Sequence, residues 1–169
     1  MRCTMRSYLL AASLTFLSFT SQAAPTPTEV VESFIQAYNK HDVELMVQHT
    51  SETVRWMHIT GTKVEVETSD RTEFGAAMTD YFETLKDANA TILQIIDSGS
   101  YVSTVERVTW DNDGEHLSQC SIGTFRVKAG KLAEFWYFPA HACDEQPPQE
   151  MIEQDVVEPE IGVLQETQQ

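Results

Sequence analysis

The sequence predicts an α+β domain in which a curved antiparallel sheet wraps around three N-terminal helices. Two observations support this fold class. Three segments with helical apolar spacing occupy the first half of residues 24–143, and four strand-like segments fill the second half. Short turns join these four segments, and such turns connect neighbouring antiparallel strands.

The first two helices are predicted from their capping residues. Thr26 can cap a helix, Pro27 suits its first position, and Glu29 completes a capping box. Asp42 then caps a shorter helix that ends near His49. The apolar stripe of the first helix consists of Val30, Val31, Phe34, Ile35 and Tyr38.

A hairpin and a third helix follow. Residues 53–59 alternate as a strand, Thr60 and Gly61 turn the chain, and residues 63–67 return. Asp70 then opens the longest amphipathic helix. Its apolar positions are Phe74, Ala77, Met78, Tyr81, Phe82 and Leu85.

The second half predicts an antiparallel meander with turns rich in Gly, Asp and Asn. We expect the three helices and the hairpin to cover one face of this meander, because its apolar side must be buried. The predicted strands span residues 91–97, 101–110, 115–128 and 132–138.

Both ends of the chain differ from the domain. Residues 1–23 place arginines before an apolar run and small residues at its end, a pattern typical of a cleaved signal peptide, so we expect an exported protein, periplasmic or secreted. Residues 144–169 hold eight acids and neither Lys nor Arg. This composition predicts a disordered acidic tail. The alternative is a docking tail for a basic partner.

Charge and cysteine content limit the functional classes. Removal of the signal peptide leaves 9 basic and 26 acidic residues, a net charge of −17, which argues against nucleic acid as a partner. The apolar run is too short for a membrane span, which needs about 20 residues. Cys120 and Cys143 are candidates for a disulfide, and the alternative is two free thiols. We find no metal-site spacing and predict neither metal nor cofactor.

Several strings resemble the nuclear transport factor 2-like superfamily, and most closely its SnoaL-like and ketosteroid isomerase-related branch. They are Phe34 to Asp42, Val54 to His58, Gly61, Gly130 to Leu132 and Phe135 to Phe138. The resemblance implies a cone-shaped fold with a pocket on the concave side of the sheet, and a homodimer formed through the sheet. It does not imply one function, since this scaffold hosts both enzymes and binding modules.

The resemblance carries the catalytic residues over only in part. The position of the isomerase general base matches His58, and an imidazole can also move a proton. The two oxyanion donors match Phe34 and Gly123, which have no donor groups. Ketosteroid isomerisation is therefore disfavoured, because oxyanion stabilisation is usually the largest catalytic contribution.

The turns predict a strand register. It pairs Gly123 with Trp136 and Glu106 with Gln119, and alternation assigns the remaining side chains to faces. The outward face then carries Tyr101, Ser103, Arg107, Cys120, Ile122, Thr124, Phe135 and Tyr137. The predicted pocket residues are Phe34, Tyr38, Trp56, Thr104, Gln119, Ser121, Trp136 and Phe138.

Glu106 is the notable inward residue, because burying a carboxylate is costly unless it is paired. One interpretation pairs Glu106 with His58 as a general acid and base. The other gives Glu106 a hydrogen bond from Gln119 or a backbone amide and makes His58 a structural residue.

Two functions follow from these alternatives. We favour an exported module that binds an apolar small molecule or a second copy of itself. The alternative is a cofactor-free isomerase, cyclase or dehydratase in which His58 and Glu106 transfer protons.

Overall fold

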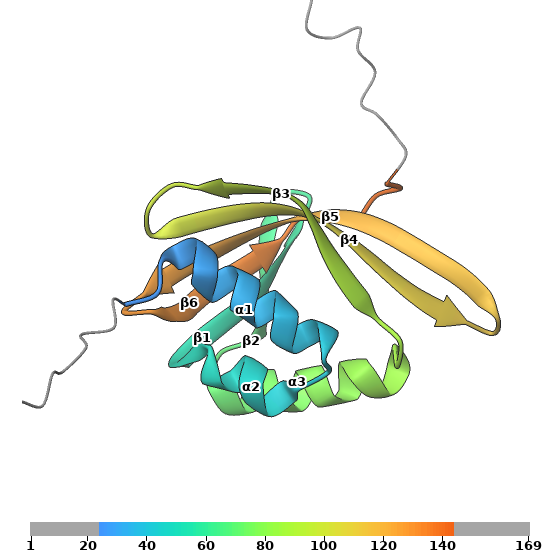
Figure 1. Ribbon diagram of the computed structural model, residues 1–169, viewed down its shortest axis with the longest axis horizontal. Helices are drawn as coiled ribbons and strands as arrows, with labels where there is room; N and C mark the ends of the chain where they lie inside the picture. The colour runs from blue at the N-terminus through green and yellow to red at the C-terminus, as the bar shows by residue number, and fades with distance from the viewer. Residues whose placement is uncertain (1–23, 144–169) are drawn as a thin grey trace, which may run out of the picture.

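The computed structural model describes residues 24–143. The predicted signal peptide (residues 1–23) and acidic tail (residues 144–169) therefore lie outside the described residues. Three helices lie beneath a curved six-stranded sheet, which is the predicted fold class (Figure 1). Among the described residues, no helix has both the length and the apolar character needed to cross a membrane.

The helices begin where their capping residues predict. The Thr26 side chain accepts a hydrogen bond from the amide of Glu29, and the Glu29 side chain binds the Thr26 amide in return. The side chains of Asp42 and Asp70 cap the other two helices. The helices are α1 (Pro27–Asn39), α2 (Val43–Gln48) and α3 (Arg71–Thr84).

The strands form one sheet in the order β2-β1-β6-β5-β4-β3. All neighbours are antiparallel except β1 and β6, which run parallel. The bounds are β1 (Thr50–Thr60), β2 (Lys63–Thr68), β3 (Asn89–Asp97), β4 (Tyr101–Asn112), β5 (Glu115–Lys128) and β6 (Lys131–Tyr137).

The hairpin of β1 and β2 extends this sheet, so the expectation that it covers a face of the meander was wrong. Without β1, the outer edge of β6 would expose a row of unpaired backbone groups. Pairing β1 with β6 satisfies these groups and lengthens the curved sheet.

The core fills the concave side of the sheet. Four phenylalanines, at most 3% exposed, meet there with ring centroids 5.6 to 6.3 Å apart, within the range of favourable aromatic pairs. They come from α1, α3, β5 and β6, so they tie the helices to the sheet. These residues are Phe34, Phe74, Phe125 and Phe135.

The end of α1 is attached to the edge strand β3. The Asn39 amide donates to the carbonyl of Ala90 at 2.8 Å, and the Ala90 amide donates back to Asn39 Oδ1 at 2.7 Å. The asparagine thus replaces a neighbouring strand at this point. The attachment fixes the last turn of α1, which carries Tyr38.

The predicted register of β5 and β6 was wrong by one residue. Val127 pairs with Leu132 as the turn predicts, but Arg126 then pairs with Glu134, so β6 contains a bulge at Ala133. Beyond the bulge the remaining side chains of β6, up to Tyr137, change face. Phe135 and Tyr137 therefore lie on the concave side, and Trp136 lies on the convex side.

The register of β4 and β5 was wrong by two residues, with a different result. Asp113 and Gly114 form a two-residue turn with positive φ angles of 50° and 83°. Glu106 therefore pairs with Ser121 and not with Gln119. A shift of two keeps each residue on its predicted face, so Glu106 points inward.

Candidate functional site

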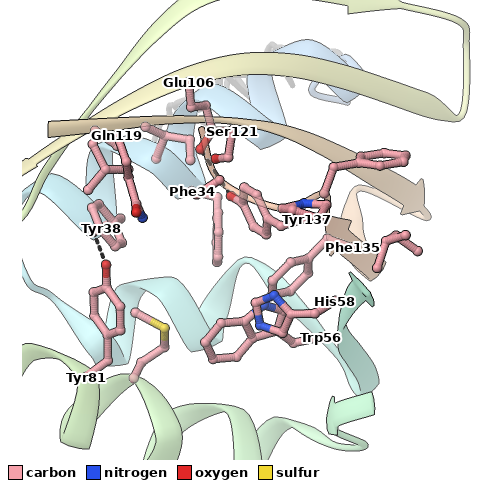
Figure 2. A pocket seen from close by; sticks show the side chains of 18 of the residues that line it. Phe34, Tyr38, Trp56, His58, Tyr81, Glu106, Gln119, Ser121, Phe135 and Tyr137 are labelled. Atoms are coloured by element: carbon pink, nitrogen blue, oxygen red, sulfur yellow. Dashed lines mark hydrogen bonds between the residues drawn. The ribbon is translucent and has the colours of Figure 1, made fainter. Parts of the chain in front are cut away.

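A cavity of about 450 Å³ lies between the concave face of the sheet and the helices. Figure 2 shows side chains from α1, α3 and the strands directed into it. Most of the lining is aromatic or aliphatic. It comprises Phe34, Ile35, Tyr38, Met46, Trp56, His58, Ile59, Thr60, Glu65, Phe74, Met78, Tyr81, Ala90, Glu106, Val108, Gln119, Ser121, Phe135, Tyr137, Phe138, Pro139 and Ala140.

Glu106 is the buried acid of this cavity, with 2% of its surface exposed. The Thr104 hydroxyl donates to Glu106 Oε1 at 2.5 Å, and the Tyr137 hydroxyl donates to Oε2 at 3.1 Å. Burial raises the pKa of Glu106, and these two hydrogen bonds oppose the rise. The carboxyl is therefore easier to protonate than an exposed glutamic acid.

Tyr137 reaches Glu106 because the facing residue on β5 is a glycine. Gly123 pairs with Tyr137, and a Cβ at Gly123 would lie 2.8 Å from Tyr137 Cε1 and 3.0 Å from Thr104 Oγ1. The missing side chain thus leaves room for the tyrosine ring. Burial and the neighbouring Glu106 raise the pKa of Tyr137, so the phenol keeps its proton at neutral pH.

A second polar group is the pair of tyrosines from α1 and α3. The hydroxyls of Tyr38 and Tyr81 lie 3.0 Å apart and share a hydrogen bond (Figure 2). Burial, followed by the proximity of Tyr81, raises the pKa of Tyr38, and burial also raises the pKa of Tyr81. Both hydroxyls remain protonated and can serve as neutral donors and acceptors.

His58 lies on a different part of the lining from Glu106. Its ring centroid is 5.2 Å from that of Trp56, and Figure 2 shows the two side chains together, apart from Glu106. The described contacts include no hydrogen bond between His58 and Glu106. The other interpretation expected Glu106 to accept a hydrogen bond from Gln119 or a backbone amide. Its donors are instead the hydroxyls of Thr104 and Tyr137.

The other predicted pocket residues divide into two groups. Phe34, Tyr38, Trp56, Gln119, Ser121 and Phe138 all line the cavity.

Two predicted pocket residues lie elsewhere. Thr104 is buried behind the cavity wall, where it supports Glu106. Trp136 lies beyond the bulge on the convex side, with its ring centroid 6.3 Å from that of Tyr101. Sequence reasoning missed Tyr137 as a partner of Glu106, because the turn before β6 pairs Gly123 with Trp136 and gives no sign of the bulge that replaces this pair by Gly123 and Tyr137.

The two cysteines of the domain lie next to each other. The Cα atoms of Cys120 and Cys143 are 4.9 Å apart, a geometry compatible with the predicted disulfide. Within residues 24–143, no group of three or more His, Cys, Asp and Glu side chains is arranged to hold a metal ion.

Residues 31–135 match the family described as the SnoaL-like domain. The chain belongs to the SnoaL-like domain family. No match is found among curated protein sequences.

Several solved structures share this fold. A nuclear transport factor 2-like protein from Burkholderia thailandensis has a TM-score of 0.59 and 19% identity, with 69% of this chain and 92% of that chain covered. A loop-truncation variant of IdmH has a TM-score of 0.59 and 17% identity, with 68% and 91% covered. TerC, co-crystallised with polyporic acid, has a TM-score of 0.57 and 12% identity, with 66% and 88% covered.

Proposed function

We propose that this SnoaL-like domain is an exported module that binds a small, mostly apolar molecule in its cavity. One observation carries the proposal: an aromatic cavity of about 450 Å³ has a partly buried Glu106–Tyr137 hydrogen bond in its wall. Ligand sites typically measure about 300–1,000 Å³ and combine apolar walls with a few polar groups. Both features are present here.

The polar groups favour a ligand that carries a carbonyl or hydroxyl oxygen. When Glu106 is protonated, its own O–H can donate to Tyr137, which frees the Tyr137 hydroxyl hydrogen for a ligand acceptor. The Tyr38–Tyr81 pair offers a second polar contact. The co-crystallisation of TerC with polyporic acid is consistent with a small organic ligand in this fold, and we extend that expectation to this chain.

The test is a thermal-shift screen against steroids, polyketide-like aromatics, terpenoids and fatty acids. A ligand selective for the folded state raises the midpoint of unfolding. Two leucine variants on the same strand provide the comparison, because Ser121 lines the cavity and Ser118 is exposed. A ligand of the cavity should stabilise the wild type and Ser118→Leu but not Ser121→Leu. A screen without hits, or hits insensitive to Ser121→Leu, would contradict the proposal.

Proton-transfer catalysis is the second candidate, and the raised pKa of Glu106 favours it. A buried carboxyl with a raised pKa keeps its proton to a higher pH than an exposed one, and it can act as a general acid on a bound carbonyl compound. Such an enzyme would be a cofactor-free isomerase, cyclase or dehydratase. Glu106→Gln should then abolish turnover of a screening hit while retaining its binding, whereas equal turnover by the variant would exclude this role.

Proton transfer by His58 needs a separate test, because His58 does not contact Glu106. His58→Gln should reduce turnover only if the imidazole transfers a second proton. Equal turnover by wild type and His58→Gln would exclude that role.

Export and self-association complete the proposal. Amino-terminal sequencing of the secreted or periplasmic protein should begin at residue 24 or 25 if the signal peptide is removed.

The convex face carries exposed apolar side chains, and we propose that a second copy covers them. Sedimentation should give a dimer that Ile122→Asp dissociates. These side chains are Ile96, Tyr101 and Ile122, exposed by 53%, 41% and 41%.

A further inference from the structure

The residues that follow β6 form part of the cavity wall. Phe138, Pro139 and Ala140 all line the cavity, although they lie beyond the last strand and are exposed to solvent on their other side. We name residues 138–140 the rim segment. A ligand in the cavity would contact this segment directly, so its position matters for binding.

Few backbone contacts hold the rim segment in place. The Phe138 amide donates to the carbonyl of Ile122 at 3.0 Å. Beyond the segment, His141 and Cys120 exchange two backbone hydrogen bonds of 2.9 and 2.8 Å. Short exposed segments held by so few bonds open locally at low free-energy cost.

Cys143 lies just beyond these bonds, where a disulfide would add a covalent attachment. It lies beside Cys120, which is 2% exposed and belongs to β5. The neighbours of Cys120 on that strand, Gln119 and Ser121, line the cavity. A disulfide at this point therefore fastens the rim segment to β5, the strand beside it, which also contributes to the cavity wall.

We propose that the Cys120–Cys143 disulfide positions the rim segment for ligand binding, so that the oxidised protein binds more tightly than the reduced protein. This inference rests on the proposed binding function. Reduction by a dithiol such as dithiothreitol breaks the S–S bond and yields two thiols, while the dithiol becomes its own cyclic disulfide. The rim segment is then held by backbone hydrogen bonds alone.

The test measures binding of N-phenyl-1-naphthylamine, a neutral apolar fluorophore, to the oxidised protein, the dithiothreitol-reduced protein and Cys143→Ser. If the rim segment is in place for only one tenth of the time without the disulfide, the dissociation constant rises roughly tenfold. Circular dichroism at the assay temperature verifies that all three samples are folded. Equal affinity in the three folded samples would overturn the inference and leave the binding function intact.

A matched pair of variants separates the rim segment from general surface effects. Phe138 and Leu93 are both large apolar side chains at exposed sites, 41% and 47% exposed, but of the two only Phe138 lines the cavity. Phe138→Ala should weaken binding of the fluorophore while keeping the disulfide, and Leu93→Ala should leave the affinity unchanged. Equal effects of the two variants would also overturn the inference. Failure of the oxidised wild type to bind the fluorophore would instead overturn the proposed function, and this inference with it.

Discussion

Substitution of Glu106 by glutamine should stabilise the protein by an amount that grows with pH. Glutamine has the same shape, and its amide can accept a hydrogen bond from one of Thr104 and Tyr137 and donate one to the other. The variant therefore keeps the local packing and removes only the cost of ionising a buried carboxyl. At low pH, where the wild-type carboxyl is protonated, the two proteins should have similar free energies of unfolding.

The sign follows from the direction of the pKa shift. The pKa of Glu106 is raised in the folded state from its ordinary value of 4.5 because the side chain is buried. Its stabilising contribution is therefore complete below pH 4.5 and is lost as the pH rises toward the folded-state pKa. Within that window the wild type should lose about 1.4 kcal/mol of unfolding free energy per pH unit relative to Glu106→Gln. Above it the difference should be constant.

Urea denaturation at a series of pH values from about 4 to about 8 measures this difference, and urea does not screen charges. Glu115→Gln, at an exposed site on the neighbouring strand, controls for the loss of one negative charge. The other acidic residues are the same in both proteins, so their contributions cancel in the difference between the two free energies of unfolding. A difference between wild type and Glu106→Gln that does not change with pH would refute the assignment of Glu106 as a buried acid with a raised pKa.

Three further changes test the surroundings of the site. Tyr137→Phe removes a donor that lowers the pKa of Glu106, so that pKa should rise further, as an NMR titration of the carboxyl carbon would show. Gly123→Ala should cost about 1–3 kcal/mol in urea denaturation, because the new methyl group would overlap the Tyr137 ring. Cys143→Ser should lower the free energy of unfolding by about 3 kcal/mol, because without the disulfide the unfolded chain between Cys120 and Cys143 is no longer a closed loop. An unchanged denaturation midpoint would argue against the disulfide.

The sequence predicts the element boundaries well because local interactions determine them. The capping box at Thr26 and the caps at Asp42 and Asp70 depend on contacts within a few residues. The turn between β4 and β5 was located correctly but predicted too long, because only Asp113 and Gly114, with their positive φ angles, form it. The parallel pairing of β1 with β6 joins segments far apart in sequence, and local patterns do not reveal it.

The site was predicted only in part, and the bulge at Ala133 explains the main error. A bulge leaves no clear signal in a single sequence, yet it moves every later side chain of β6 to the other face. Trp136 was therefore assigned to the cavity in place of Tyr137. Glu106 was placed inward because its strand alternates regularly, and an error of two residues does not change the face.

The polar centre of the cavity depends on three features that lie on different strands. β4 supplies the inward Glu106, the bulge in β6 turns Tyr137 inward, and Gly123 on β5 leaves space between them. At the positions that resemble the oxyanion donors of ketosteroid isomerases, this chain has Phe34 and Gly123. Neither side chain can donate a hydrogen bond. Here Gly123 leaves the space that Tyr137 occupies. A bound oxygen should therefore meet its donor at Tyr137, so a ligand that orients its oxygen toward α1 at Phe34 would contradict this reasoning.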